Sequence, residues 1–99
     1  MNQPTQNSNT PAILSAAGVA LAANPARKAF SVTNLGTNPL FVLLGTGAST
    51  SVFHYILKGS TVDSDGTGGV LTFSDGIIFD GVVSVAGTSP KFVVLEIAP

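Results

Sequence analysis

The chain has 99 residues, no cysteine, one histidine and a formal net charge of -1, which fits one domain. These values exclude disulfides and thiolate metal sites, and they leave no basic stripe for binding nucleic acid. Charged residues make up 9% of the chain, against about 25% in typical soluble domains. Since a neutral surface packs against a neighbour without a large cost for desolvating ions, the composition favours contact with copies of the chain or with a partner.

The N-terminal stretch of residues 1–11, MNQPTQNSNTP, is polar, uncharged and without apolar periodicity. It cannot bury enough apolar surface to order itself, so it is predicted to be a flexible or extended arm. Two interpretations remain open, a terminus without a role and an arm that orders by lying on a neighbouring subunit. The run that follows, Ala12 to Ala23, is too short to span a bilayer, and no Lys or Arg precedes it as in a signal peptide.

Residues 12–99 are predicted to form one antiparallel β-sandwich, jelly-roll-like, with about eight short strands. Gly, Pro, Asn and Asp recur between stretches rich in Val, Ile, Leu and Phe, which is typical of an all-β domain. The first strand is alanine-rich and could instead be a helix, but Gly18 and Pro25 favour a strand. The predicted strands are Ile13 to Leu21, Arg27 to Asn34, Leu40 to Gly45, Val52 to Lys58, Val70 to Phe73, Ile77 to Phe79, Val82 to Ala86 and Lys91 to Ile97.

A nine-residue phrase occurs twice, as GTNPLFVLL from Gly36 to Leu44 and as GTSPKFVVL from Gly87 to Leu95. In each copy glycine permits positive φ, and proline belongs at the start of the returning strand because it cannot donate to a ladder. Each copy is therefore predicted to be a β-hairpin, and the two hairpins are expected in related places in the two halves of the sandwich.

The tails of both phrases, Leu40 to Leu44 and Phe92 to Leu95, are apolar on both faces. In a small sandwich one face of such a strand lies in the core and the other must be covered. The cover could be residues 12–23 or another subunit.

The strongest candidate site is the loop from Asp63 to Gly69, in which the carboxylates of Asp63 and Asp65 are two residues apart. Calcium loops place oxygen ligands at such alternate positions. However, the twelfth position is Ser74 instead of a bidentate Glu, so a solvated turn is favoured and calcium binding stays open. With Asp75 and Asp80, which each precede a glycine, these aspartates could gather at one end of the sandwich.

No catalytic, cofactor-binding or metal-binding residue is predicted, and the chain is not expected to be an enzyme. His54 alternates with apolar neighbours and is expected at the surface or in an interface. The serines within Ala48 to Ser51 lack the nucleophile elbow of a hydrolase, and Gly45 to Gly47 lacks the context of a dinucleotide site.

Most of the chain after residue 20 resembles a module of small tailed-phage virion structural proteins, of the capsid decoration or cement type. The resemblance implies a β-sandwich that is seated on the bacteriophage capsid surface, contacts the major capsid protein and forms a homotrimer. It brings no catalytic residues. The residues that carry it are Ala23 to Lys28, Phe30 to Asn34, Gly36 to Val42, Leu57 to Gly59, Asp65 to Gly69 and Gly81 to Thr88.

The function expected from the sequence is therefore a non-enzymatic structural role in a virion, through protein contacts made by residues 1–11 and by the apolar second faces near Phe41 and Phe92. The alternative is a glycan- or receptor-binding module of a tail or head fibre, and a third option is a subunit of a non-viral assembly. The absence of Trp and the single Tyr weaken this alternative, because sugar sites usually offer exposed aromatic platforms. Neither nucleic acid nor membrane is an expected partner.

Overall fold

The fold was analysed in a computed structural model that describes residues 7–74 and 78–99. Within these residues the chain forms eight strands and no helix, so the prediction of an all-β sandwich is confirmed. The strands are β1 (Asn7–Ser8), β2 (Gly18–Leu21), β3 (Ala29–Asn34), β4 (Leu40–Leu44), β5 (Tyr55–Leu57), β6 (Val70–Phe73), β7 (Val83–Ala86) and β8 (Phe92–Ala98).

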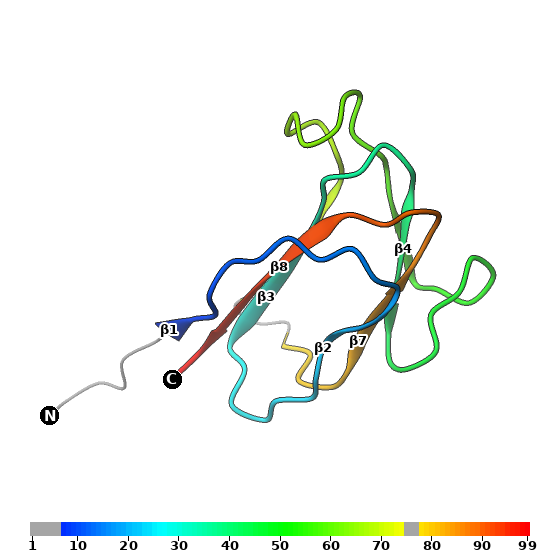
Figure 1. Ribbon diagram of the computed structural model, residues 1–99. Coiled ribbons are helices and arrows are strands. Elements are labelled where there is room, and N and C mark those ends of the chain that lie inside the picture. The colour runs from blue at the N-terminus through cyan, green and yellow to red at the C-terminus, as the bar shows by residue number, and fades with distance from the viewer. Residues whose placement is uncertain (1–6, 75–77) are drawn as a thin grey trace, which may run out of the picture.

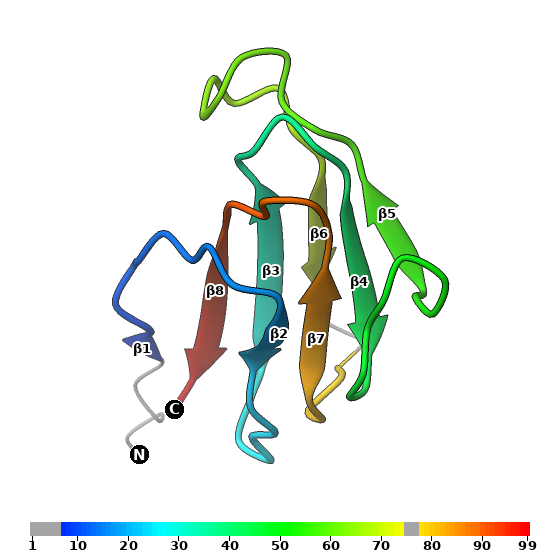
Figure 2. The same cartoon turned by 45° about the vertical axis from the view of Figure 1, so that its right-hand side comes forward.

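The strands form two antiparallel sheets of four strands each. The first sheet has the order β1-β8-β3-β6 and the second has the order β2-β7-β4-β5 (Figures 1 and 2). In this order β1 pairs with β8, β2 with β7, β3 with β6 and β4 with β5, which is the pairing of a jelly roll. Every connection except the one from β4 to β5 therefore crosses from one sheet to the other.

The core lies between the sheets and is built mainly from alternate residues of β3, β4, β7 and β8. In β3, Phe30 and Val32 are buried while Ser31 and Thr33 point outward, as the alternating sequence predicts. The centroid of the Phe73 ring lies 5.1 Å from that of Phe30 and 6.1 Å from that of Tyr55. The contact between Phe73 and Tyr55 connects β6 and β5, the edge strands of the two sheets. The buried apolar cluster consists of Leu21, Phe30, Val32, Leu40, Val42, Leu57, Val83, Val85, Phe92 and Val94.

Three predicted strands differ from those observed. The strand expected from Val52 to Lys58 is shorter, since β5 contains only Tyr55 to Leu57. The strand expected from Ile13 to Leu21 is observed only from Gly18, where β2 begins. Before it, among residues 13–17, only Leu14 forms an isolated bridge, to Phe92. The strand expected from Ile77 to Phe79 is wrong for Ile78 and Phe79, which are irregular, and its first residue lies outside the described residues.

The predicted arm, residues 1–11, contains a strand that its composition does not indicate. Asn7 and Ser8 form β1, which pairs with the last strand, β8. Asn9 extends the attachment: its amide nitrogen donates to the carbonyl of Val94, and its side-chain oxygen accepts from the backbone N–H of Glu96. The side chain of Asn9 thus helps to attach this segment to β8. The sequence does not indicate the attachment, because the segment has no apolar periodicity.

The prediction that each repeated phrase forms a hairpin is wrong. Gly36 to Pro39 carries the chain from β3 in the first sheet to β4 in the second, and Gly87 to Pro90 carries it back from β7 to β8. The two crossings lie side by side, since β3 pairs with β8, β4 pairs with β7, and Asn38 donates to the carbonyl of Thr88. Gly and Pro specify a tight reversal, but they do not specify which sheet the returning strand joins.

The two copies also bury opposite residues. In the first copy Leu40 and Val42 face the core, whereas in the second Phe92 and Val94 do, an offset of one position. Phe41, which matches Phe92 in sequence, therefore points outward. The outward side of β4 is partly covered by the chain itself, through residues 45–54 that connect it to β5, and not by residues 12–23, whose strand β2 pairs with β7.

Asn34, at the end of β3, holds the crossings at one end of the sandwich. Its buried side-chain amide donates to the carbonyls of Asn38, Leu57 and Lys58 at 2.9 to 3.1 Å, and its side-chain oxygen accepts from the N–H of Gly36. One side chain therefore joins the crossing from β3 to β4 to the end of β5 and to the crossing that follows it.

Two glycines let the crossing of residues 58–69 approach β3 and its turn closely. A Cβ on Gly59 would overlap the carbonyl group of Thr37, and a Cβ on Gly68 would overlap that of Asn34. Both positions therefore require glycine for close approach of two backbones.

We predict that Asn34→Ala lowers the free energy of unfolding by about 2–4 kcal/mol, because the carbonyls of Asn38, Leu57 and Lys58 lose a buried donor. Chemical denaturation checks this. Thr37→Ala, in the same turn but exposed, is the control and should change stability by less than about 0.5 kcal/mol. Equal effects of the two substitutions would contradict the role of Asn34.

Candidate functional site

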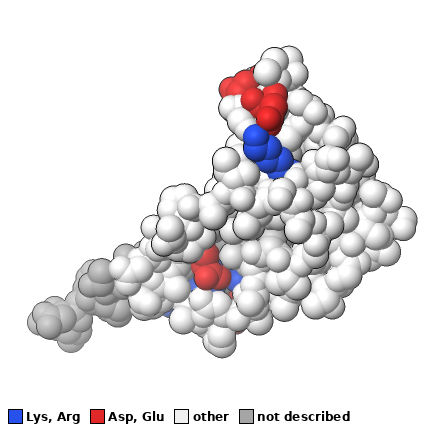
Figure 3. Space-filling model, viewed as in Figure 1, with Lys and Arg blue, Asp and Glu red and all other residues white. Residues whose placement is uncertain are grey.

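The charged side chains occupy little of the surface. Figure 3 shows red and blue atoms gathered at two places on the face in view, separated by white surface. One place belongs to the loop that contains Asp63 and Asp65, where the Nζ of Lys91 lies 2.9 Å from a carboxylate oxygen of Asp63. At the opposite end of the sandwich, the side chain of Glu96 is 21% exposed and pairs with Arg27, whose side chain is fully buried.

The carboxylates of the candidate calcium loop bond to groups of the protein. Lys91 and the hydroxyl of Ser64 donate to Asp63, and these bonds lower the pKa of its carboxyl. Asp65 accepts from the hydroxyl and the N–H of Thr67 and from the N–H of Val62, and the bonds from Thr67 lower its pKa most. Because these exposed carboxylates already have donors, the loop has the contacts of a stabilised turn.

The expectation that the aspartates gather at one end is wrong for those that the structure describes. Asp80 lies at the Arg27 end, where its carbonyl accepts from the N–H of Asn24, and Asp63 and Asp65 lie at the Asn34 end. Asp75 lies outside the described residues. Within the described ranges no three His, Asp or Glu side chains converge to hold a metal, and no helix there is long and apolar enough to cross a bilayer.

His54 is exposed, as expected, and its Nδ1 accepts a hydrogen bond from the backbone N–H of Leu44 at 3.0 Å. Ser49 and Ser51 bond to each other and to nearby N–H groups in the same loop. Among the described contacts, no histidine or carboxylate bonds to either hydroxyl.

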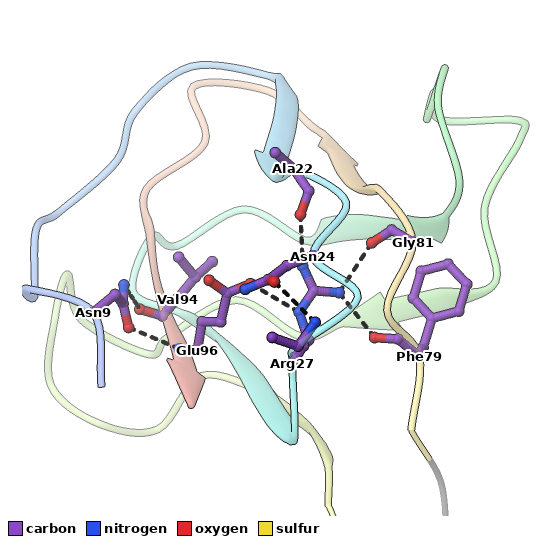
Figure 4. Close-up of polar contacts among 9 residues, drawn as sticks. Asn9, Ala22, Asn24, Arg27, Phe79, Gly81, Val94 and Glu96 are labelled. Atoms are coloured by element: carbon purple, nitrogen blue, oxygen red, sulfur yellow. Dashed lines mark hydrogen bonds and ion pairs between the residues drawn. The ribbon is translucent and has the colours of Figure 1, made fainter. Parts of the chain in front are cut away.

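Arg27 forms a buried ionic cluster that the sequence does not reveal. Its Nε lies 2.8 Å from a carboxylate oxygen of Glu96, and its remaining nitrogens donate to the carbonyls of Ala22, Phe79 and Gly81 at 2.7 to 2.9 Å (Figure 4). Its guanidinium also lies 5.4 Å from the centroid of a core phenylalanine ring, within cation–π range.

The cluster around Arg27 is architectural. The Arg27 side chain is fully buried, with none of its area exposed, so a ligand cannot reach the guanidinium. Its donors connect the crossings from β2 to β3 and from β6 to β7 to the last strand, in a geometry suited to the planar fork of arginine. The sequence does not indicate that Arg27 is buried, because it is next to the exposed Lys28 in a Pro-Ala-Arg-Lys run.

The outward side of the first sheet is the best candidate for a binding surface. Two rows of side chains cross it: Thr72, Ser31 and Leu95 in one, and Val70, Thr33 and Val93 in the other. Val70 is 56% exposed and Leu95 41% exposed. We call these six residues the neutral face, because it combines hydroxyl and aliphatic groups without any charge.

The neutral face differs from the surface that the sequence suggests. Phe92, expected to mark an apolar second face, points into the core and is 1% exposed, so Val93 and Leu95 take its place. The sequence of β3 could have indicated the neutral face, because Ser31 and Thr33 alternate there with core residues.

Comparison with protein-family models, with curated protein sequences and with solved structures found no match for this chain.

We predict that Arg27→Met lowers the free energy of unfolding by about 3 kcal/mol, because the Glu96 carboxylate and three carbonyls lose their donor. Arg27→Lys should also destabilise, since an ammonium group cannot reproduce the planar set of contacts. Denaturant titration measures both.

The control is Lys28→Met, at the adjacent exposed position, which should change the free energy of unfolding by no more than about 0.5 kcal/mol. If Arg27→Met were as stable as this control, the contacts of Arg27 would not be what holds the crossings together.

Proposed function

We propose that this chain is a non-enzymatic structural protein of a phage particle that decorates or cements the capsid through protein contacts. The observation that carries the proposal is the neutral face, a regular sheet surface with two exposed aliphatic side chains and no ion. The resemblance of the sequence to small phage virion proteins supplies the identity of the partner, the major capsid protein.

The physical argument rests on the cost of desolvation. A face made of Ser, Thr, Val and Leu loses little when water leaves it, whereas each buried ion must find a partner. Burying aliphatic area contributes roughly 25 cal/mol per Å². A rigid sheet also loses little conformational entropy on binding, so that less of the binding free energy is lost to ordering the contact.

The alternative, a glycan-binding module, has less support. Its candidate calcium ligands, Asp63 and Asp65, already accept hydrogen bonds from their own loop and from Lys91. Phe41 packs against Phe53 at 5.0 Å between ring centroids, so these rings are not free platforms for a sugar.

The first experiment measures binding of the purified chain to capsids of the phage that encodes it, after these are stripped of the protein. The wild-type chain should bind saturably, at a fixed number of copies per particle. We predict that Leu95→Glu weakens binding at least about tenfold, because an unpaired carboxylate would be buried at the contact.

Ile56→Glu is the matched control, since Ile56 is exposed to a similar degree, at 54%, on the second sheet. It should bind like the wild type. Absence of saturable binding by the wild-type chain would refute the decoration role, and loss of binding only with Ile56→Glu would place the contact on the other sheet.

We further propose that the protein acts as a homotrimer, as the resemblance implies. Sedimentation velocity of the purified chain should show a species of three times the mass of 10.0 kDa that grows with concentration. A monodisperse monomer at high concentration would contradict the trimer, without affecting the capsid-binding measurement.

A further inference from the structure

The edge strands of the two sheets differ in how readily they can pair with a further strand. β1 has two residues, β5 has three, and β2 has a register shift between Val19 and Leu21. Short strands and bulges of this kind limit pairing at an edge. The fourth edge strand, β6, has four residues in continuous register with β3, and it contains neither Pro nor a charged residue.

Half of the backbone groups of β6 face away from β3. The N–H of Asn34 donates to the carbonyl of Gly69, so in this antiparallel ladder the odd-numbered residues of β6 direct their N–H and carbonyl groups toward β3. Those of Val70 and Thr72 therefore point outward from the edge of the sheet. Outside the ladder, no backbone hydrogen bond among the described residues reaches either residue.

The side chains of β6 are accessible on both sides of the strand. Val70 is 56% exposed, and Thr72 beside it on the neutral face is exposed too. Leu71 and Phe73 pack against the core, yet both are only partly buried. A strand added at this edge would therefore bury apolar area of Leu71 as well as supply partners for the outward backbone groups.

The edge of β6 is complementary to itself. When two copies of β6 run antiparallel about a twofold axis, Val70 of each copy can lie opposite Thr72 of the other. Because these are the residues with outward backbone groups, the two pairs form about four backbone hydrogen bonds. On the core side, Leu71 then faces its equivalent in the second copy.

The absence of charge favours a second copy as the occupant of this edge. Two identical strands bring identical side chains close together, so that charged residues on the strand would repel one another. Neither β6 nor the neutral face contains a charged residue. Pairing at β6 would also join the neutral faces of the two copies into one surface.

We propose that β6 is a self-association edge, through which two copies of the chain join their first sheets into one continuous sheet. The contact is small compared with the interfaces of stable dimers, so it is strengthened where copies are held side by side. It does not depend on the proposed capsid binding. A twofold contact is compatible with the proposed homotrimer, because closed assemblies of D3 symmetry contain both kinds of axis.

Disulfide trapping of the purified chain tests the pairing, since the wild type contains no cysteine. A mixture of the variants Val70→Cys and Thr72→Cys should form a mixed disulfide dimer, because opposed residues of a hydrogen-bonded pair lie about 5.5 Å apart between Cα atoms. Thr72→Cys alone should cross-link at least about tenfold more slowly, because diagonal neighbours lie about 7–8 Å apart, beyond the reach of a disulfide.

The matched control is a mixture of Ser31→Cys and Thr33→Cys, which have the same spacing on the same face but lie in β3, inside the sheet. It should cross-link at the slow rate of random collisions. Leu95→Glu, introduced into both chains of the first mixture, should leave its rate unchanged, which separates this contact from capsid binding. Equal rates for the two mixtures, or equally fast cross-linking of Thr72→Cys alone, would overturn the proposal.

Discussion

Crossing between the sheets is the constraint on which the rest of this structure depends. All but one of the connections change sheets, so each must bury or satisfy backbone groups where no ladder supplies partners. Asn34 does this at one end, by binding carbonyls of two crossings, and Arg27 does it at the other, by binding carbonyls of two crossings and the carboxylate of the last strand. The chain has only four Lys and Arg residues, yet one of them, Arg27, is buried. Its planar guanidinium suits this position because it can donate to several acceptors at once.

The fold class could be predicted from the sequence because strand patterning is local. Alternation in residues 29–34 correctly predicted that Phe30 and Val32 of β3 face the core. Which strands pair could not be predicted, because Gly-Thr-Asn-Pro suits a hairpin and a crossing equally well. The one-position offset between the repeated phrases follows from this, since the sheet that a strand joins decides which of its alternate residues face the core.

The candidate surfaces were predicted only in part, for a related reason. Whether Phe92 or Val93 points outward depends on pairing with β3, which is distant in sequence. The cover over Phe41 was expected from residues 12–23 or a neighbour, yet it comes from the chain's own loop, fixed by Ser84 and His54. The burial of Arg27 beside the exposed Lys28 likewise needs the closed sandwich, because the two cations are equivalent in local sequence.

The position of β8 has a consequence for how the molecule is made. β8 is synthesised after the other seven strands, yet it lies between β1 and β3, and it pairs residue 98 with residue 7. Until it emerges, β3 has only β6 beside it, and Arg27 lacks Glu96. Contacts of such long sequence separation slow folding, because loop-closure entropy is lost before they form. Assembly of the first sheet must therefore follow translation of the last strand, with the N-terminal residues docking late.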